Sequence, residues 1–268
     1  MIVKEVKAKT IILSKSKVFD YTVNPYIGCE HGCTYCYARF MKRYTGHKEE
    51  WGGFVDVKTN AYCMLQKELN KRRKTGRVWI SGTCDPYQPL EKKYEITRKC
   101  LEILAESAWP VTIQTKSSLA TRDTELLRKI ANVEVGLTIT TADDKIRQIF
   151  EPKAPPIRER IQTLDALHSS GIRTFAMIAP LLPKAEKLPE QLAKKIDYAL
   201  IDKMNYHYAD WVYRKNALEY ATAEKFLQRN KCATCQRLRK TRNSMASPVL
   251  MAYHGKRRFV NFQKHECF

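Results

Sequence analysis

The sequence contains little glycine and proline and no long hydrophobic run. Its 268 residues include 10 Gly and 11 Pro, which is too few for a low-complexity or disordered chain. No apolar run approaches the roughly 20 residues of a membrane-spanning helix, and no secretory signal is visible. Because 44% of the residues are hydrophobic, the chain is able to bury a sizeable core, and its length fits one large domain with or without an appendage.

Acidic residues are scarce relative to basic ones. The 48 Lys and Arg against 28 Asp and Glu give a formal net charge of +20. Residues 228–264 alone carry ten Lys or Arg and no Asp or Glu. Such a field favours nucleic acid as a partner, and less often a membrane surface or an acidic partner. A general basic shift without a specific partner is the alternative interpretation.

Cysteine is abundant, since the chain has nine. Without a secretory signal, this number indicates metal or thiol chemistry in a reducing cytoplasm rather than disulfides. We therefore expect a cytoplasmic protein with no membrane partner.

Short Val-, Ile- and Thr-rich runs alternate with amphipathic segments. Strands are predicted at residues 20–27, 77–81, 110–115, 133–140, 172–180 and 198–204. Helices are predicted at residues 56–75, 91–107, 121–131, 158–170, 189–196 and 216–228. This alternation predicts an α/β fold with a parallel sheet, a partial (β/α)6 TIM-like barrel over residues 1–228. Residues 229–268 are predicted to form a basic, cysteine-containing C-terminal extension that binds metal in one interpretation.

Polar clusters follow the predicted strands. They are the cysteine loop after the first strand and residues 81–85, 115–117, 138–141 and 180–183. In barrels of this kind the chemistry gathers at the carboxyl ends of the strands. The convergence of these clusters predicts one active site at that end.

Three cysteines stand close together in the stretch NPYIGCEHGCTYCYARF. Cys29, Cys33 and Cys36 have the spacing C-x3-C-x2-C. Three thiolates are able to bind three irons of a [4Fe-4S] cluster, because soft sulfur suits such clusters. The fourth iron then stays open for a small molecule with an amine and a carboxylate. The alternative is a zinc knuckle completed by His31 or His47.

This spacing, with Tyr35 before the last cysteine, resembles the signature of the radical S-adenosylmethionine (SAM) superfamily. The stretches SGTCDPYQPLE and FEPKAPPIRERI, followed by GIRTFAMIAPLLP, resemble the spore photoproduct lyase-like branch, also described as DNA repair photolyase-like. The resemblance implies an enzyme that reductively cleaves S-adenosylmethionine at a [4Fe-4S] cluster. The 5'-deoxyadenosyl radical then abstracts hydrogen from a substrate. An electron donor such as flavodoxin or ferredoxin is implied as a partner.

The resemblance also implies contacts to S-adenosylmethionine from several strand ends. The methionine amino group would meet Ser81, Gly82 and Thr83, the carboxylate Lys116, the ribose Thr138 and Thr140, and the adenine Tyr35. Glu151 and Arg160 contact the cofactor in one interpretation and form a structural ion pair in the other. A solvent-exposed loop lysine remains the alternative for Lys116.

The family's hydrogen-donating cysteine has no direct counterpart in this sequence. Gly82 stands at its position in SGTCD, and Cys84 follows two residues later. One interpretation makes Cys84 the catalytic hydrogen donor, and the other makes it a small buried residue. Cys63 and Cys100 lie on predicted helices and are expected to be core residues.

The C-terminal extension contains the pair Cys232 and Cys235 and a late Cys267. With His254 or His265 these residues form a candidate second site for zinc or an auxiliary iron–sulfur cluster. Free thiols are the alternative. The surrounding Lys, Arg, Tyr and Phe residues would offer phosphate contacts and stacking platforms.

Three functions follow. The first is a radical SAM enzyme that acts on nucleic acid, in DNA repair or nucleic-acid modification, with a flipped or single-stranded nucleotide as substrate. The second is a radical SAM enzyme that modifies a peptide, protein or small molecule with help from the auxiliary metal site. The third is a zinc-bearing, non-enzymatic nucleic-acid-binding protein.

Overall fold

The protein was analysed as a computed structural model that describes residues 1–14, 20–72, 75–204, 207–222, 226 and 249–252. The candidate second metal site at Cys232, Cys235 and Cys267 lies outside these residues, so it remains a prediction. The same holds for the proposed boundary between residues 228 and 229.

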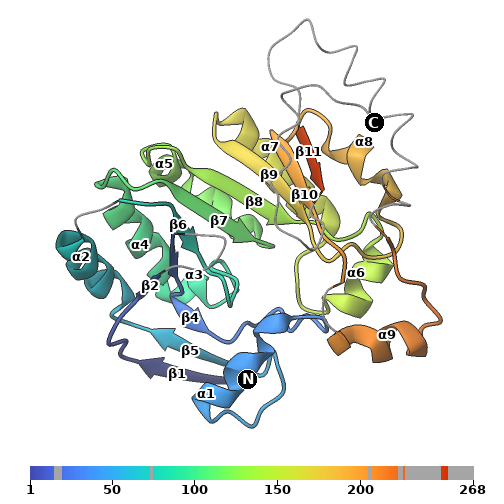
Figure 1. Cartoon of the computed structure of the whole chain (residues 1–268), viewed down its shortest axis with the longest axis horizontal. Helices are drawn as coiled ribbons and strands as arrows, with labels where there is room; N and C mark the ends of the chain where they lie inside the picture. The colour runs from blue at the N-terminus through green and yellow to red at the C-terminus, as the bar shows by residue number, and fades with distance from the viewer. Residues whose placement is uncertain (15–19, 73–74, 205–206, 223–225, 227–248, 253–268) are drawn as a thin grey trace, which may run out of the picture.

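One large sheet forms the framework of the described chain (Figure 1). Its strands lie in the order β11-β10-β9-β8-β7-β6-β3-β2. All neighbours in it are parallel except β2 and β3. The strands are β2 (Ile12–Ser14), β3 (Tyr21–Val23), β6 (Val78–Ile80), β7 (Val111–Thr115), β8 (Glu134–Thr138), β9 (Arg173–Ile178), β10 (Tyr198–Ile201) and β11 (Val249–Ala252).

Six of these strands, β3 and β6 to β10, are those predicted from the sequence. Their parallel order follows the chain order, and the sheet has two separate edges at β2 and β11. The predicted α/β fold, a partial TIM-like barrel, is therefore confirmed. The added strand β11 lies within the predicted extension and pairs in parallel with β10.

Helical segments connect the strands. The α-helices are α1 (Lys42–Thr45), α2 (Ala61–Lys71), α3 (Glu91–Tyr94), α4 (Ile96–Ala105), α5 (Thr124–Leu127), α6 (Asp144–Phe150), α7 (Ile157–Ser169), α8 (Leu188–Leu192) and α9 (Asp210–Lys215). The 3-10 helices are η1 (Tyr37–Met41), η2 (Ser118–Asp123), η3 (Ala185–Lys187) and η4 (His207–Ala209).

The predicted helix over residues 56–75 is wrong in its first part. Residues Phe54–Lys58 form β5, which pairs with β1 (Ile2–Val6) in parallel and with β4 (Tyr26–Ile27) in antiparallel orientation. Figure 1 shows this small sheet beside the β6 end of the large one. The predicted strand over residues 20–27 accordingly divides between the two sheets. The partner of β5 is about fifty residues away in sequence, so local periodicity could not reveal the pairing.

Three other helix predictions need correction. The helix over residues 91–107 breaks at Glu95, which has a φ of 53°, because the Glu91 carboxylate accepts the amide hydrogens of Thr97 and Arg98 and so begins α4 anew. Residues 121–131 divide into the end of η2 and α5. In the predicted helix over residues 216–228, the stretch 216–222 is not helical, and α9 ends at Lys215.

The main core is a large apolar cluster between sheet and helices, and a smaller second cluster lies around the cysteine loop. Cys100 lies in the main core, as predicted, whereas Cys63 is exposed on α2 and is not a core residue. Gly136 of β8 is required by packing, since a Cβ there would lie 2.1 Å from the Phe175 ring. A close approach of this kind excludes any larger residue.

Candidate active site

The cysteine loop follows β4 and leads into η1. Cys29 and Cys33 are buried and Cys36 is half-buried. The loop turns at Gly28, whose φ is +87° and whose Cβ would lie 2.4 Å from the Phe54 carbonyl oxygen. Only glycine fits this combination of left-handed backbone and close contact.

Two side-chain hydrogen bonds join the loop to the segment after β6. The Gln88 amide oxygen accepts the backbone N–H of Glu30 at 2.9 Å. The Glu30 carboxylate in turn accepts the backbone N–H of Leu90 at 2.6 Å. On the other side, the Thr34 N–H donates to the Phe150 carbonyl at 2.9 Å. The loop is thereby fixed between the β6 end and α6.

The three thiols fit an iron–sulfur cluster better than a single zinc ion. Among the residues that the structure describes, no three His, Cys, Asp or Glu side chains are placed to hold one ion. A four-iron cluster does not require this, because each thiolate binds a different iron. Burial raises the pKa of Cys29 and Cys33, and raises that of Cys36 to about 11. Such thiols need a strongly cationic partner to ionise.

Both histidines of the zinc alternative contact carboxylates. His47 contacts Glu49 through Nδ1 and Asp56 through Nε2, each at 2.9 Å. His31 Nδ1 lies 3.4 Å from the Asp85 carboxylate. Burial alone lowers the pKa of His31, but the charges of Asp85 and Cys29 raise it to about 10. The other ring nitrogen of His31, Nε2, is buried and has no hydrogen-bond partner among the described residues.

A buried charge cluster lies beside the loop. Glu151 and Arg160 are both fully buried and form an ion pair with 2.5 Å between Oε2 and Nη2. Tyr35 and Thr140 donate their hydroxyl hydrogens to the other carboxylate oxygen, Thr140 at 3.0 Å. Burial raises the pKa of Glu151, but Arg160, Lys116 and the Tyr35 hydrogen bond hold it below its usual value. The structure therefore joins four of the predicted residues in one network, with Arg160 and Glu151 as an ion pair.

Lys116 stands at the end of β7, next to this cluster. Its Nζ lies 5.8 Å from the centroid of the Tyr35 ring. Burial lowers the pKa of Lys116, but the charges of Cys33 and Glu151 outweigh this and raise it above the usual value. Lys116 is half-buried, so it is not a fully solvent-exposed loop residue.

Asp85 positions the β7 end and was not assigned a role from the sequence. Its carboxylate accepts the Thr115 hydroxyl at 2.5 Å and the Lys116 backbone N–H at 2.7 Å. Burial raises the pKa of Asp85, but His31, the Thr115 hydrogen bond and the charge of Lys116 lower it to about 2. Its place before a proline in CDPY was the available signal, since a carboxylate there often closes a turn.

Residues 81–84, which follow β6, form another wall of the predicted site. Ser81 has a φ of +65°, and its hydroxyl lies 3.3 Å from the Cys84 sulfur. The Asn24 side-chain oxygen accepts the Thr83 N–H at 3.1 Å. The Gly82 carbonyl accepts the Tyr37 hydroxyl. Asn24 was also missed, although it stands directly before the proline that opens the cysteine motif.

Cys84 is half-buried and packs against the main core. Burial raises its pKa to about 11, so the thiol keeps its hydrogen at neutral pH. Cys84 is thus a packed residue, and its role as a hydrogen donor stays a prediction. The Thr138 hydroxyl accepts a hydrogen bond from the Gln114 side chain at 3.0 Å.

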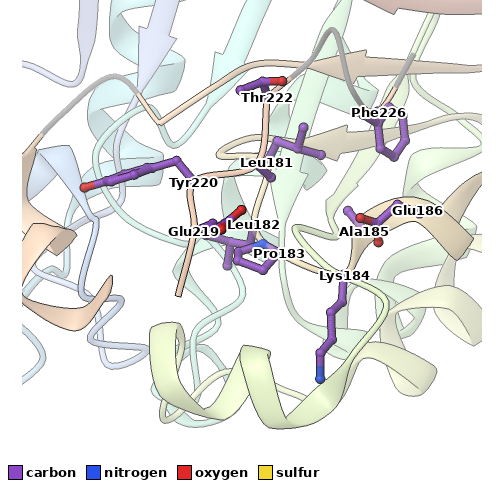
Figure 2. Close-up of a pocket in the computed structure, with 11 residues that line it drawn as sticks. Leu181, Leu182, Pro183, Lys184, Ala185, Glu186, Glu219, Tyr220, Thr222 and Phe226 are labelled. Carbon is purple, nitrogen blue, oxygen red and sulfur yellow. The ribbon is translucent and has the colours of Figure 1, made fainter. Parts of the chain in front are cut away.

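A pocket of about 540 Å³ opens next to this site (Figure 2). Residues 181–186, which follow β9, and residues 219–222 with Phe226 line this pocket. Leu182 belongs to both regions, because it packs with Cys33 and Tyr35 and its N–H donates to the Thr140 carbonyl at 3.0 Å. The pocket is therefore continuous with the packing around the cysteine loop.

The fold and the site define a partial barrel with a three-cysteine loop and a buried charge cluster at the carboxyl ends of its strands. The model of the Radical SAM superfamily matches residues 23–196. The chain belongs to this family and is a radical SAM enzyme. The family implies a [4Fe-4S] cluster and S-adenosylmethionine.

Relatives in sequence and structure agree with this assignment. An uncharacterised protein of Methanocaldococcus jannaschii is 37% identical over 182 residues, which are 68% of each chain. A spore photoproduct lyase mutant with bound AdoMet and dinucleoside spore photoproduct has a TM-score of 0.64 at 15% identity, over 92% of this chain and 80% of that one. Streptococcus suis SuiB bound to precursor peptide SuiA has a TM-score of 0.56 at 15% identity, over 85% and 48%. At these identities the structural likenesses show a shared fold.

Within the described residues, no helix is both long and apolar enough to cross a membrane.

Proposed function

We propose that this radical SAM enzyme acts on nucleic acid, in DNA repair or nucleic-acid modification. The proposal rests on one arrangement in a chain of net charge +20. Tyr35, Lys116, Thr140 and Glu151 lie together beside the cysteine loop. The charge favours a polyanion. The structurally similar lyase was solved with a dinucleoside spore photoproduct, a ligand derived from nucleic acid.

In this proposal Cys29, Cys33 and Cys36 hold the [4Fe-4S] cluster. When bound, the cluster and S-adenosylmethionine together supply a 5'-deoxyadenosyl radical, with the electron coming from a donor such as flavodoxin or ferredoxin. The protonated Lys116 offers a charge-assisted hydrogen bond to the methionine carboxylate. The other proposed contacts to S-adenosylmethionine are Tyr35, Ser81, Gly82, Thr83, Thr138 and Thr140.

Cys84 is the proposed hydrogen donor to the substrate radical. Its raised pKa keeps the S–H bond intact at neutral pH, and Ser81 lies within contact of the sulfur. In the transfer a C–H bond forms on the substrate, the S–H bond breaks and a thiyl radical remains. One electron from the protein donor and one proton restore the thiol.

The C-terminal cysteines Cys232, Cys235 and Cys267 are proposed to hold a second metal, zinc or an iron–sulfur cluster, near the basic residues of the extension. The abundance of thiols leads us to propose the cytoplasm as the site of action.

A peptide substrate is the second candidate. It is favoured by the structural likeness to SuiB, which was solved with a precursor peptide. Turnover of S-adenosylmethionine with matched pools of oligonucleotides and peptides separates the two candidates.

The test is anaerobic reconstitution of the full chain, followed by quantification of 5'-deoxyadenosine under reductant. Single-stranded DNA, RNA or peptide is added in turn. We expect nucleic acid to stimulate product formation and to acquire the chemical change. Stimulation by peptides alone would overturn the nucleic-acid proposal, and a failure to form 5'-deoxyadenosine under any condition would contradict radical SAM catalysis.

Matched variants sharpen the test. Cys33→Ala removes a proposed cluster ligand, whereas Cys63→Ala removes an exposed thiol on α2. Lys116→Met is expected to weaken binding of S-adenosylmethionine by about tenfold or more, the value of one charge-assisted hydrogen bond. Lys129→Met, at an exposed position, serves as its control.

A further inference from the structure

The exposed aromatic residues gather in one part of the molecule. In the described chain the exposed large hydrophobic residues are Met1, Ile2 and Val3 at the start of the chain and five aromatic residues. The five are Tyr37, Tyr44, Tyr208, Trp211 and Tyr220, with exposed fractions of 36–77%. All of them lie on η1 and α1, which follow the cysteine loop, or on η4, α9 and the segment after α9.

The two groups form one surface, which we call the aromatic rim. The Arg39 guanidinium lies 4.9 Å from the centroid of the Tyr208 ring and so joins η1 to η4. Phe40 extends the first group, with 6.3 Å between its ring centroid and that of Tyr44. In the second group the Tyr220 hydroxyl donates to Asp210 at 2.5 Å, beside Trp211. Figure 1 shows α1 and α9 at the same lower end of the molecule.

The rim is positively charged. Residues 37–48 and 207–220 contain six Lys or Arg and two carboxylates, Asp210 and Glu219. Asp210 already contacts His207 at 3.0 Å and Tyr220, so its charge is partly compensated. Exposed rings among cations are the arrangement that single-stranded nucleic acid uses, with bases stacked on rings and phosphates on Lys and Arg.

The rim also leads to the predicted active site. Tyr37 directly follows Cys36, and its hydroxyl donates to the Gly82 carbonyl in the wall that contains Cys84. A strand lying on the rim would therefore pass the edge of the site.

We propose that the aromatic rim binds single-stranded nucleic acid and delivers a nucleotide to the site. The inference rests on the proposed function and specifies its substrate as an unpaired strand. A duplex hides the faces of its bases, so stacking on these rings requires unpaired bases. The charge complementarity and the ring exposure together favour a strand over a peptide.

The test is binding of the reconstituted full chain to an oligothymidylate of about 15 nucleotides, compared with the duplex of the same length. Trp211 is an exposed tryptophan, whereas Trp79 and Trp109 are buried. We expect binding to quench the fluorescence of Trp211, and we expect the dissociation constant for the single strand to be at least about fivefold lower than for the duplex.

The variants separate stacking from charge. Trp211→Ala is expected to raise the dissociation constant about fivefold or more, and Trp211→Phe to restore most of the affinity. Arg43→Ala is expected to reduce the slope of log affinity against log salt by about 0.7, the value of one phosphate contact on a single strand. Lys67→Ala, exposed on α2, should leave the slope unchanged. Formation of 5'-deoxyadenosine without nucleic acid should be unaffected in all four variants.

The outcomes distinguish the inference from the proposed function. Strong single-strand binding that these rim variants do not change would contradict binding at the aromatic rim. The proposal that the enzyme acts on nucleic acid would then still hold. Absence of nucleic-acid binding at low salt would overturn both. Rim-dependent binding to anionic lipid vesicles, without binding to oligonucleotides, would assign the surface to a membrane and refute the inference.

Discussion

Replacement of Arg160 by methionine tests the buried charge cluster. The guanidinium is fully buried on α7 and pairs with Glu151 at 2.5 Å. It also donates to the backbone carbonyls of Thr138 and Pro155, each at 2.9 Å. Methionine has a similar length and preserves much of the packing, so Arg160→Met mainly removes the charge and the hydrogen bonds.

The expected loss is large because the partner charge stays behind. Removing one member of a buried ion pair costs about 3–5 kcal/mol, since the remaining charge is uncompensated. Two carbonyls also lose a donor, at about 1 kcal/mol or more each when they stay dry. We therefore take about 3 kcal/mol as a lower bound for the decrease in the free energy of unfolding caused by Arg160→Met. For a chain of this size this corresponds to a decrease in melting temperature of about 6 °C or more.

The pH dependence has a defined sign. The pKa of Glu151 lies below its usual value in the folded protein, so the stability that this carboxylate contributes is present above the usual pKa and is lost as the pH falls through the folded pKa. Without Arg160, burial raises the pKa of Glu151, and protonation relieves the uncompensated charge. The difference in the free energy of unfolding between wild type and Arg160→Met should therefore be largest at neutral pH. It should become smaller as the pH falls toward about 5.

The assay is anaerobic urea unfolding followed by circular dichroism. The matched control is Arg158→Met on the same helix, where the arginine is exposed and the change should stay within about 0.5 kcal/mol. The double variant Arg160→Met with Glu151→Gln should recover part of the loss, because no buried charge remains. Equal destabilisation by Arg160→Met and Arg158→Met would refute the reasoning.

Two further predictions concern the cysteine loop and the neighbouring thiol. Gly52→Ala should lower the amount of iron bound per chain after reconstitution, because a Cβ at Gly52 would lie 2.7 Å from the Cα of Gly32 in the cysteine loop. The control Gly171→Ala should bind iron normally, because φ is also positive there but the space is open. Equal iron content in the two variants would contradict the role of the close contact. Alkylation at pH 8, followed by peptide mass spectrometry, should modify the exposed Cys63 and leave Cys84 largely unmodified. The reason is that a pKa of about 11 for Cys84 makes its reactive thiolate rare. Equal labelling of Cys63 and Cys84 would contradict the burial and the protonation of Cys84.

The local sequence pattern was sufficient to predict the elements whose hydrophobic residues follow a regular pattern along the chain. The parallel strands β6 to β10 read as short β-branched runs, because both faces of such a strand are buried. The helix α7 ended where Gly171 was expected to stop it, apart from small differences at its ends. By contrast, β5 and the break at Glu95 depend on distant partners, a strand at the start of the chain and the carboxylate of Glu91, so periodicity did not indicate them.

Residue type and spacing alone predicted the chemistry of the site. Three cysteines in eight residues predict a cluster-binding loop because sulfur ligation depends on residue type and spacing. The contacts of the remaining residues follow from the tertiary structure. It paired Arg160 with Glu151, placed Asp85 under the end of β7 and brought η1 against η4. Such contacts join segments up to about 170 residues apart, and their energies depend on burial and distance, which a linear pattern does not contain.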